Sequence, residues 1–357
     1  MQLNTLFGKN ESKAIKGIAI IMMFWNHLFM HPDMLVNNYW TSMLMLPNGI
    51  SVEEFLSPVF HICVPIYIFI AGYGFAIKFI GMDGNIDNFL RSIKNLYKKY
   101  WLVFIFVIPI LAQKKVITIK VFELIGNFAG YLSTYVGEWW FFSLYVELMV
   151  IAFLMRSILK RLNIKQLIWG SIIICCCGYA LYYVFNSIAI FKMIAESTLW
   201  GQIYYILIKQ PIFICGIIFF RKELFANIYA KMKGKYYLYL LTFLILCTGV
   251  YLPVPETFYD VIVVAAFILL LCVTFNRFNI LLRIFVKIGN YSTYMWLTHS
   301  VLIFYLLQNQ IYKFHFSLSC VAMTFLFALF VSICFNYIDA GSTKVIGKLE
   351  RIIKMRN

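Results

Sequence analysis

Segments of about 20 mostly apolar residues recur along this chain, and no other feature constrains its fold as strongly. In a membrane such a segment forms a helix, because its backbone N–H and C=O groups must bond within the segment. The pattern predicts an all-α polytopic membrane protein with about ten transmembrane helices. Residues 114–136 can also hold an interfacial or re-entrant helix. The expected spans are 15–31, 58–80, 97–113, 136–155, 164–186, 202–220, 236–253, 259–276, 292–310 and 315–338.

The composition excludes a soluble fold for a chain of this size. Hydrophobic residues make up 62% of the 357 residues, and the mean hydropathy is +0.82. A soluble domain of this length has no interior large enough for so much apolar surface. We expect a single transmembrane domain over residues 1–357, with no separate soluble domain and no cleaved signal peptide. The expected location is the cell membrane, as a multi-pass protein.

The net charge of +16 reflects the loops between apolar segments, so we do not expect a nucleic-acid partner. Most of the 31 Lys and Arg residues lie in segments on the same side as the N-terminus. Because positive residues are enriched in cytoplasmic loops, both termini are expected in the cytoplasm. The basic segment 344–356 is expected to contact anionic membrane lipid.

The middle of the chain offers few candidates for a functional site. Residues 164–276 are mostly apolar, and we expect them to serve packing, with few buried polar groups. The nine cysteines of the chain all lie in apolar spans, and none forms a CxxC pair with a metal-like partner. We interpret them as small buried hydrophobic residues, and no metal site is expected.

The first span carries polar groups along one face. Lys16 and His27 are eleven residues apart, which is about three helical turns and roughly 16 Å, so both side chains point the same way. His31 follows His27 after four residues and joins this face. A polar line along a membrane helix is costly, so it indicates a functional site. The alternative for His27 is a hydrogen bond between helices.

The fourth span holds a carboxylate near its middle. Glu147 there must be neutral, paired with a cation or open to a water-filled cavity. Glu138 lies nine residues earlier, at the outer interface and about half a turn out of phase, so the two carboxylates do not share a face. They therefore do not form a paired-acid site.

Five motifs of this chain resemble the acyltransferase-3 family of membrane O-acyltransferases, which acylate sugars of bacterial surface polysaccharides. That family carries Arg or Lys, ten residues and then His on its first membrane helix, as Lys16 and His27 stand here. Ala71-Gly72-Tyr73 resembles the family's Ser-Gly-Tyr-like turn, and Arg91 and Lys94 have the spacing of its Arg-x-x-Arg pair. The segment from Phe142 to Glu147 resembles its Trp-Ser-Leu-x-x-Glu motif. Its Gly-x-x-Ser-x-Tyr-x-x-x-x-His motif corresponds to Gly289, Ser292, Tyr294 and His299. For Gly72 and Gly74, helix packing is favoured over ligand contact.

The resemblance implies transfer of an acetyl or other short acyl group from acyl-CoA to a hydroxyl of a surface polysaccharide or its lipid-linked precursor. A histidine with a pKa near 7 suits the base that such a transfer needs, so His27 is the expected general base. Acyl-CoA is the expected donor, and no permanently bound cofactor is expected. The further expected roles are Glu147 as a second catalytic residue, Lys16, Arg91, Lys94 and His299 in donor binding, and His31 and Glu138 in acceptor binding.

Several alternatives remain open at this stage. Arg91 and Lys94 are also explained as positive-inside residues that contact lipid phosphates, and His299 as a hydrogen-bonded structural histidine. A transporter or flippase for polysaccharide intermediates would use buried His and Glu as a proton relay. No internal repeat or pair of broken helices supports that class. Whether the chain forms a homo-oligomer is left open.

Overall fold

The computed structural model describes residues 6–30, 35, 39–232, 235–248 and 255–356. Regular structure in this part of the chain is helical, apart from two isolated bridges, which confirms an all-α polytopic membrane protein. Among these residues, seven helical stretches are long and apolar enough to cross a membrane. Four of them are single helices: α4 (Ile86–Gln113), α8 (Ile164–Ser187), α10 (Thr198–Arg221) and α13 (Glu256–Arg277). Two others are joined segments: Val52–Gly81 consists of α2 (Val52–Phe60), α3 (Cys63–Phe75) and the π-helical η2 (Ala76–Gly81), and Gly137–Leu154 consists of η3 (Gly137–Trp139) and α6 (Trp140–Leu154). The seventh is the Ser317–Ser342 part of α17 (Ser317–Arg356).

Three expected spans correspond to helices that fall short of that length or apolarity in the described residues. They are α1 (Lys9–Phe29), α12 (Tyr236–Thr248), and α15 (Ser292–Ser300) together with the π-helical η6 (Val301–Leu306). The remaining elements are α5 (Val121–Phe128), α7 (Arg156–Arg161), η4 (Ala189–Phe191), α9 (Lys192–Ala195), α11 (Leu224–Met232), α14 (Asn279–Gly289) and α16 (Gln308–Ile311). The short helix α5 lies in the 114–136 region, where the sequence allowed an interfacial or re-entrant helix.

Helix α4 begins eleven residues before the expected start of its span. The side chain of Asn85 accepts a hydrogen bond from the Asn88 backbone N–H at 3.0 Å and caps the helix there. Arg91 and Lys94 are therefore helical residues with exposed side chains rather than loop residues.

Two glycines bring α1 and α14 into backbone contact. A Cβ atom at Gly289 would lie 1.9 Å from the Lys13 carbonyl oxygen, and one at Gly17 would lie 2.6 Å from the Phe285 carbonyl oxygen. Neither position has room for a methyl group, which is how small residues allow membrane helices to approach closely. This crossing places α15, which follows α14, beside α1.

A second close crossing joins α3 and α10. A Cβ atom at Gly72 would lie 2.0 Å from the Phe213 carbonyl oxygen, and one at Gly216 would lie 2.3 Å from the Phe69 carbonyl oxygen. The packing role expected for Gly72 is confirmed. The same expectation is wrong for Gly74, which is exposed and has nothing within 4 Å of a Cβ position.

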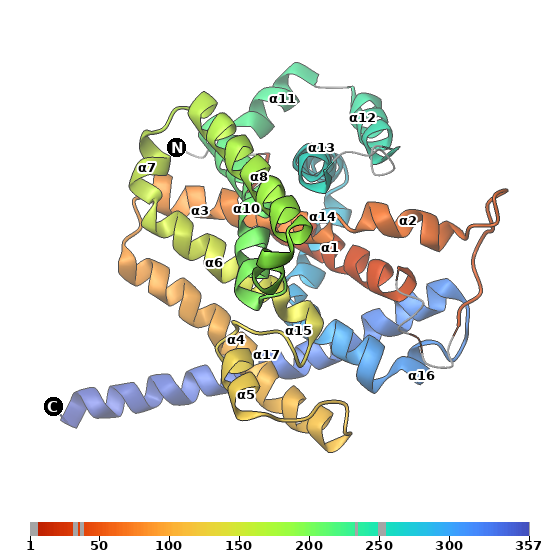
Figure 1. Cartoon of the computed structure of the whole chain (residues 1–357), viewed down its shortest axis with the longest axis vertical. Helices are drawn as coiled ribbons and strands as arrows, with labels where there is room; N and C mark the ends of the chain where they lie inside the picture. Colours follow the sequence, from red (N-terminus) through yellow and green to blue (C-terminus); the bar gives the residue numbers. More distant parts are fainter. Residues whose placement is uncertain (1–5, 31–34, 36–38, 233–234, 249–254, 357) are drawn as a thin grey trace.

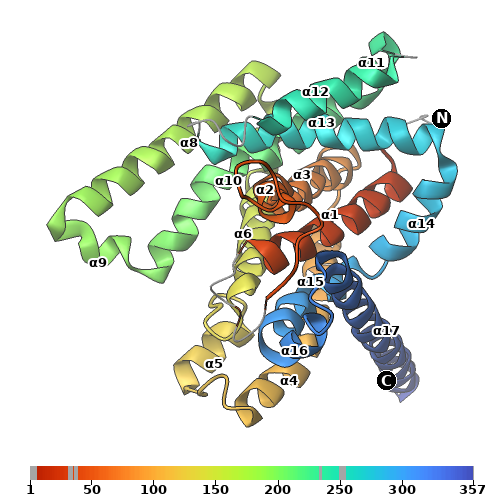
Figure 2. The same ribbon diagram turned by 90° about the vertical axis from the view of Figure 1, so that its right-hand side faces the viewer.

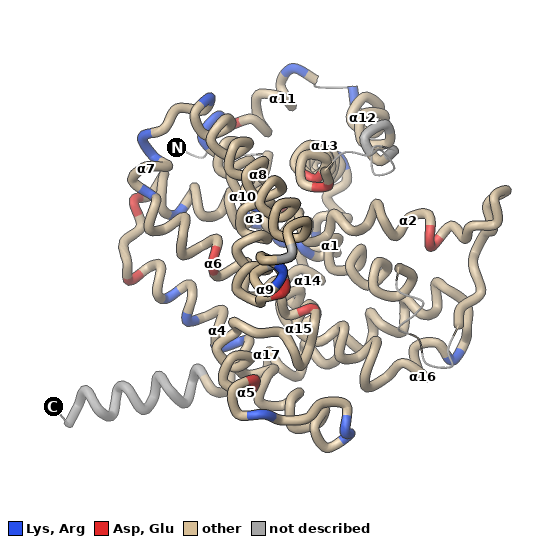
Figure 3. The backbone as a smooth tube through the Cα atoms, viewed as in Figure 1, with Lys and Arg blue, Asp and Glu red and all other residues tan. Residues whose placement is uncertain are grey.

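The helices surround α1 on several sides (Figures 1 and 2). Helices α8 and α10 lie side by side, and their ends next to α9 project away from the other helices (Figure 2). Lys and Arg residues gather at the end of the molecule that holds the N-terminus, the start of α4 and α7 (Figure 3). The charge distribution thus distinguishes the two ends of the helix bundle.

Candidate functional site

Two histidines from distant parts of the chain meet between α1 and α15. The ring centres of His27 and His299 lie 4.8 Å apart, with the rings edge to face. His299 is fully buried, and its Nδ1 atom lies 2.6 Å from the backbone oxygen of Trp296. A ring nitrogen that donates to a carbonyl carries the proton, so the Nε2 atom of His299 is an acceptor. That Nε2 atom has no hydrogen-bond partner among the described residues.

Neighbouring elements fix the position of this histidine pair. The π-helical segment η6 follows α15 directly and places Phe304 against His27, with 6.0 Å between ring centres. The indole N–H of Trp139 donates to the Leu297 carbonyl oxygen at 3.0 Å and attaches the start of α6 to α15. A π-helical turn inside a membrane helix is frequently found at functional sites.

Lys16 lies on the same face of α1 as His27, nearer to the start of the helix. Its electrostatic neighbours are Lys99 of α4 and Lys13 of α1. The Lys99 Nζ atom lies 5.5 Å from the centre of the Tyr294 ring on α15. Lys13, Lys16 and Lys99, here called the lysine cluster, bring three positive charges near one another, and Asp339 is a further electrostatic neighbour of Lys99.

Arg91 and Lys94 are separate from the lysine cluster. They precede Lys99 on α4, and among the described residues neither has a hydrogen bond or an ion pair. Sequence analysis did not single out Lys99, although it lies in the 89–101 segment that carries the other two cations. The structure thus brings Lys16 together with Lys99 on α4.

The two carboxylates expected in the site, Glu138 in η3 and Glu147 in α6, lie on different sides of the joined segment Gly137–Leu154, as their phase difference predicts. Glu138 interacts electrostatically with Tyr305, which lies in η6 beside the histidine pair. Glu147 lines a cavity between α6 and α10. A buried carboxylate oxygen of each residue has no hydrogen-bond partner among the described residues. Glu138, rather than Glu147, is therefore the carboxylate on the histidine side. His31 lies outside the described residues.

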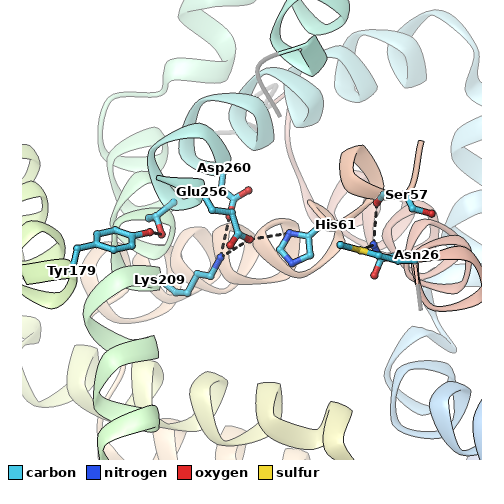
Figure 4. A network of polar contacts seen from close by, with 9 residues as sticks. Asn26, Ser57, His61, Tyr179, Lys209, Glu256 and Asp260 are labelled. Carbon is cyan, nitrogen blue, oxygen red and sulfur yellow. Dashed lines mark hydrogen bonds and ion pairs between the residues drawn. The ribbon is translucent and has the colours of Figure 1, made fainter. Parts of the chain in front are cut away.

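A second polar cluster joins α10, α13 and the link between α2 and α3 (Figure 4). Lys209 donates to Glu256 at 3.0 Å and to Asp260 at 3.1 Å, and its side chain is only 5% exposed. His61 Nδ1 lies 2.9 Å from the same oxygen of Glu256. Sequence analysis missed this network because it expected residues 164–276 to serve packing, with few buried polar groups. That expectation is wrong here, since Lys209 and Asp260 are buried charges.

The same cluster contains residues that are able to bind a metal ion. Ligand atoms of His61, Glu256 and Asp260 all lie within 4.8 Å of one another. The Lys209 ammonium group bonds both carboxylates, so a positive charge already occupies the place that a metal ion would take. The geometry therefore favours an ion-pair network that connects helices.

The acyltransferase domain model of the acyltransferase-3 family matches residues 10–338. This chain belongs to the acyltransferase-3 family. The range matched within this membrane acyltransferase contains the histidine pair and the whole lysine cluster. No curated protein and no solved structure matches the acyltransferase.

Proposed function

We propose that this membrane acyltransferase transfers an acetyl or other short acyl group from acyl-CoA to a hydroxyl of a surface polysaccharide or its lipid-linked precursor. The observation that carries this proposal is the histidine pair, which lies on the same face of α1 as Lys16. The cell membrane is the proposed location, with both termini in the cytoplasm. The charge difference between the two ends of the bundle supports this orientation (Figure 3).

His27 acts as the general base, and His299 acts as its positioning residue. The Trp296 carbonyl holds the proton of His299 on Nδ1, which leaves Nε2 without a hydrogen-bond partner among the described residues and able to accept an N–H from His27 when the two rings turn toward each other. The other nitrogen of His27 is then the acceptor for the substrate proton. Ring centres at 4.8 Å bring the two imidazole edges close enough for such a bond.

The reaction is a direct transfer without a covalent acyl-enzyme. The acceptor hydroxyl gives its proton to His27 while its oxygen forms a bond to the thioester carbonyl carbon. The carbon–sulfur bond then breaks, and the coenzyme A thiolate takes the proton from His27. The products are the ester and free coenzyme A, so atoms and charges balance.

The lysine cluster binds the donor at the cytoplasmic end. Phosphate groups of coenzyme A are attracted by the ammonium groups of Lys16 and Lys99, and the pantetheine arm extends along α1 toward His27. The separation of about three turns between Lys16 and His27 gives the arm roughly 16 Å to span. Glu138 contributes on the acceptor side, where it neighbours Tyr305.

The replacement His27→Ala tests the base assignment. We expect acetyl transfer from acetyl-CoA to extracted, deacylated surface glycan to fall by about 10²–10⁴-fold, because proton removal from the alcohol is lost. The matched control is His315→Asn. His315 stacks on Tyr39 and has a φ of +57°, which Asn tolerates. Substantial activity in folded His27→Ala protein would remove His27 from the mechanism.

A further inference from the structure

A cavity of about 200 Å³ lies on the side of α6 opposite the histidine pair. Helix α6 contributes Trp140 and Glu147 to its wall, and α10 contributes Gln202 and Tyr205. Ser133 and Thr198 complete the rim, one before α6 and the other at the start of α10. Because the segments Gly137–Leu154 and Thr198–Arg221 both begin at this rim, the cavity lies at one end of the bundle.

The size and lining of the cavity suit one sugar ring. Pockets for drug-sized ligands measure roughly 300–1,000 Å³, so this cavity is suited to a smaller molecule. Trp140 and Tyr205 stack with 4.9 Å between ring centres and form an aromatic wall. One face of each ring is covered by the stack, so the cavity meets the rings through their edges and remaining faces, which offer apolar contact for sugar C–H groups and the Trp N–H and Tyr O–H for hydrogen bonds.

The polar groups of the cavity are placed to bind hydroxyls. The Oε2 atom of Glu147 is buried and has no hydrogen-bond partner in the described part of the chain. A carboxyl oxygen left in this state is costly unless a ligand or water supplies the missing hydrogen bond. Gln202 donates to the Tyr131 carbonyl oxygen, which orients its amide at the wall.

The apolar groove between α4 and α5 provides a contrast. Its volume is about 520 Å³, and its walls include Phe104, Ile108 and Phe128 without any polar side chain. Such a surface suits a lipid chain, whereas the cavity beside Glu147 contains carboxyl, amide and hydroxyl groups. The chemical difference argues for a polar ligand in the smaller cavity.

We propose that this cavity is a saccharide subsite, which holds one sugar ring of the acceptor through Glu147, Gln202 and the Trp140–Tyr205 wall. This inference rests on the proposed function, because it assumes a glycan acceptor. The subsite lies across α6 from the histidine pair, so it binds a sugar unit other than the one that is acylated. Glu147 is thus an acceptor-binding residue that does not touch the reacting atoms.

The first test fills the cavity without disturbing the helices around it. Gly201 lines the cavity, and a Cβ atom there meets nothing within 4 Å, so Gly201→Leu adds a side chain to open space. The matched control is Gly170→Leu on α8, where a Cβ atom also meets nothing within 4 Å. The probe is an oligosaccharide mixture prepared from deacylated surface glycan, and its binding to protein in nanodiscs is measured by saturation-transfer NMR and calorimetry.

The second test compares adjacent tyrosines on α10. Tyr205 faces Trp140 in the cavity, whereas Tyr204 stacks on Tyr182 of α8 with 4.7 Å between ring centres. We expect Gly201→Leu, Tyr205→Ala and Glu147→Gln each to weaken oligosaccharide binding roughly tenfold or more. Gly170→Leu and Tyr204→Ala should leave it unchanged. Hydrolysis of acetyl-CoA by water, without acceptor, should remain at the wild-type rate in the two control variants Gly170→Leu and Tyr204→Ala.

The outcomes separate this inference from the proposed function. Unchanged oligosaccharide binding in folded Gly201→Leu and Tyr205→Ala protein would overturn the saccharide subsite. Acetyl-CoA hydrolysis by a wild-type protein that does not bind the oligosaccharides would also overturn the subsite, while showing that the protein still uses acetyl-CoA as its donor. Oligosaccharide binding that the cavity variants abolish, in a protein that never cleaves acyl-CoA, would support the subsite and refute the proposed reaction.

Discussion

At the scale of single residues, the bond between His299 and the Trp296 carbonyl determines what each histidine is able to do. His299 is held with its proton on Nδ1, three residues from its acceptor on the same helix. A side chain fixed in this way orients another group well but is poorly placed to carry a proton to a substrate. Sequence analysis expected His299 in donor binding, so kinetics must distinguish a positioning role from a binding role.

His299→Phe should lower kcat by about 10–100-fold and leave the KM for acetyl-CoA near its wild-type value, because His27 loses its orienting acceptor. Steady-state kinetics with saturating glycan would measure both constants. A raised KM with unchanged kcat would instead assign His299 to donor binding.

Lys16 and Lys99 should act through the phosphates of the donor. Lys16→Ala and Lys99→Ala are each expected to raise the KM for acetyl-CoA about tenfold, because each removes a charge-assisted hydrogen bond. Lys16→Arg is expected to raise it less, because the arginine keeps that bond. Acetyl-pantetheine carries no phosphate, so its KM should be the same for wild type and variants. Equal losses with acetyl-CoA and acetyl-pantetheine would contradict phosphate pairing.

At the scale of elements, charge networks and glycine contacts determine which helices meet. Lys209 connects α10 to α13 through two carboxylates, and Gly17 and Gly289 allow α14 to approach α1. Lys209 lies inside the expected span 202–220 and Asp260 inside the expected span 259–276. Two opposite charges in apolar segments indicate that the two spans pair, and sequence analysis could have used this signal. The partner of each charge depends on how the helices are arranged, which one sequence does not specify.

Lys209→Met should destabilise the protein by about 3–5 kcal/mol, because Asp260 is left as a buried charge without its cation. The double variant Lys209→Met/Asp260→Leu should recover most of this loss, since both charges are then absent. Denaturant titration in detergent would measure the two differences. Wild-type stability of Lys209→Met would show that the ion pair is not needed.

At the scale of the whole molecule, the apolar segments and the loop charges were sufficient to predict a polytopic helical protein. Hydropathy did not predict that α4 begins at Ile86, because charged residues lie between 86 and 97 although this stretch is helical. It also did not predict α14. For the site, the spacing of Lys16 and His27 was readable from the sequence. The approach of His299 and Lys99 to α1 depends on packing between helices far apart in the chain.

Accessibility to a membrane-impermeant maleimide would test the proposed orientation. In a cysteine-free background, Leu44→Cys should react in intact cells, whereas Met82→Cys should react only after lysis. Both side chains are exposed, at 59% and 74%, so a difference in labelling reports the side of the membrane. Labelling of Met82→Cys in intact cells would reverse the proposed topology.

Helix α17 runs without a break for 40 residues, from Ser317 to Arg356. At 1.5 Å per residue this is about 60 Å, roughly twice the thickness of the hydrocarbon layer. About half of α17 therefore lies outside the hydrocarbon layer when the helix crosses it. A reporter domain fused after Arg356 would be held at the membrane surface, because the basic residues 344–356 are expected to contact the anionic headgroups.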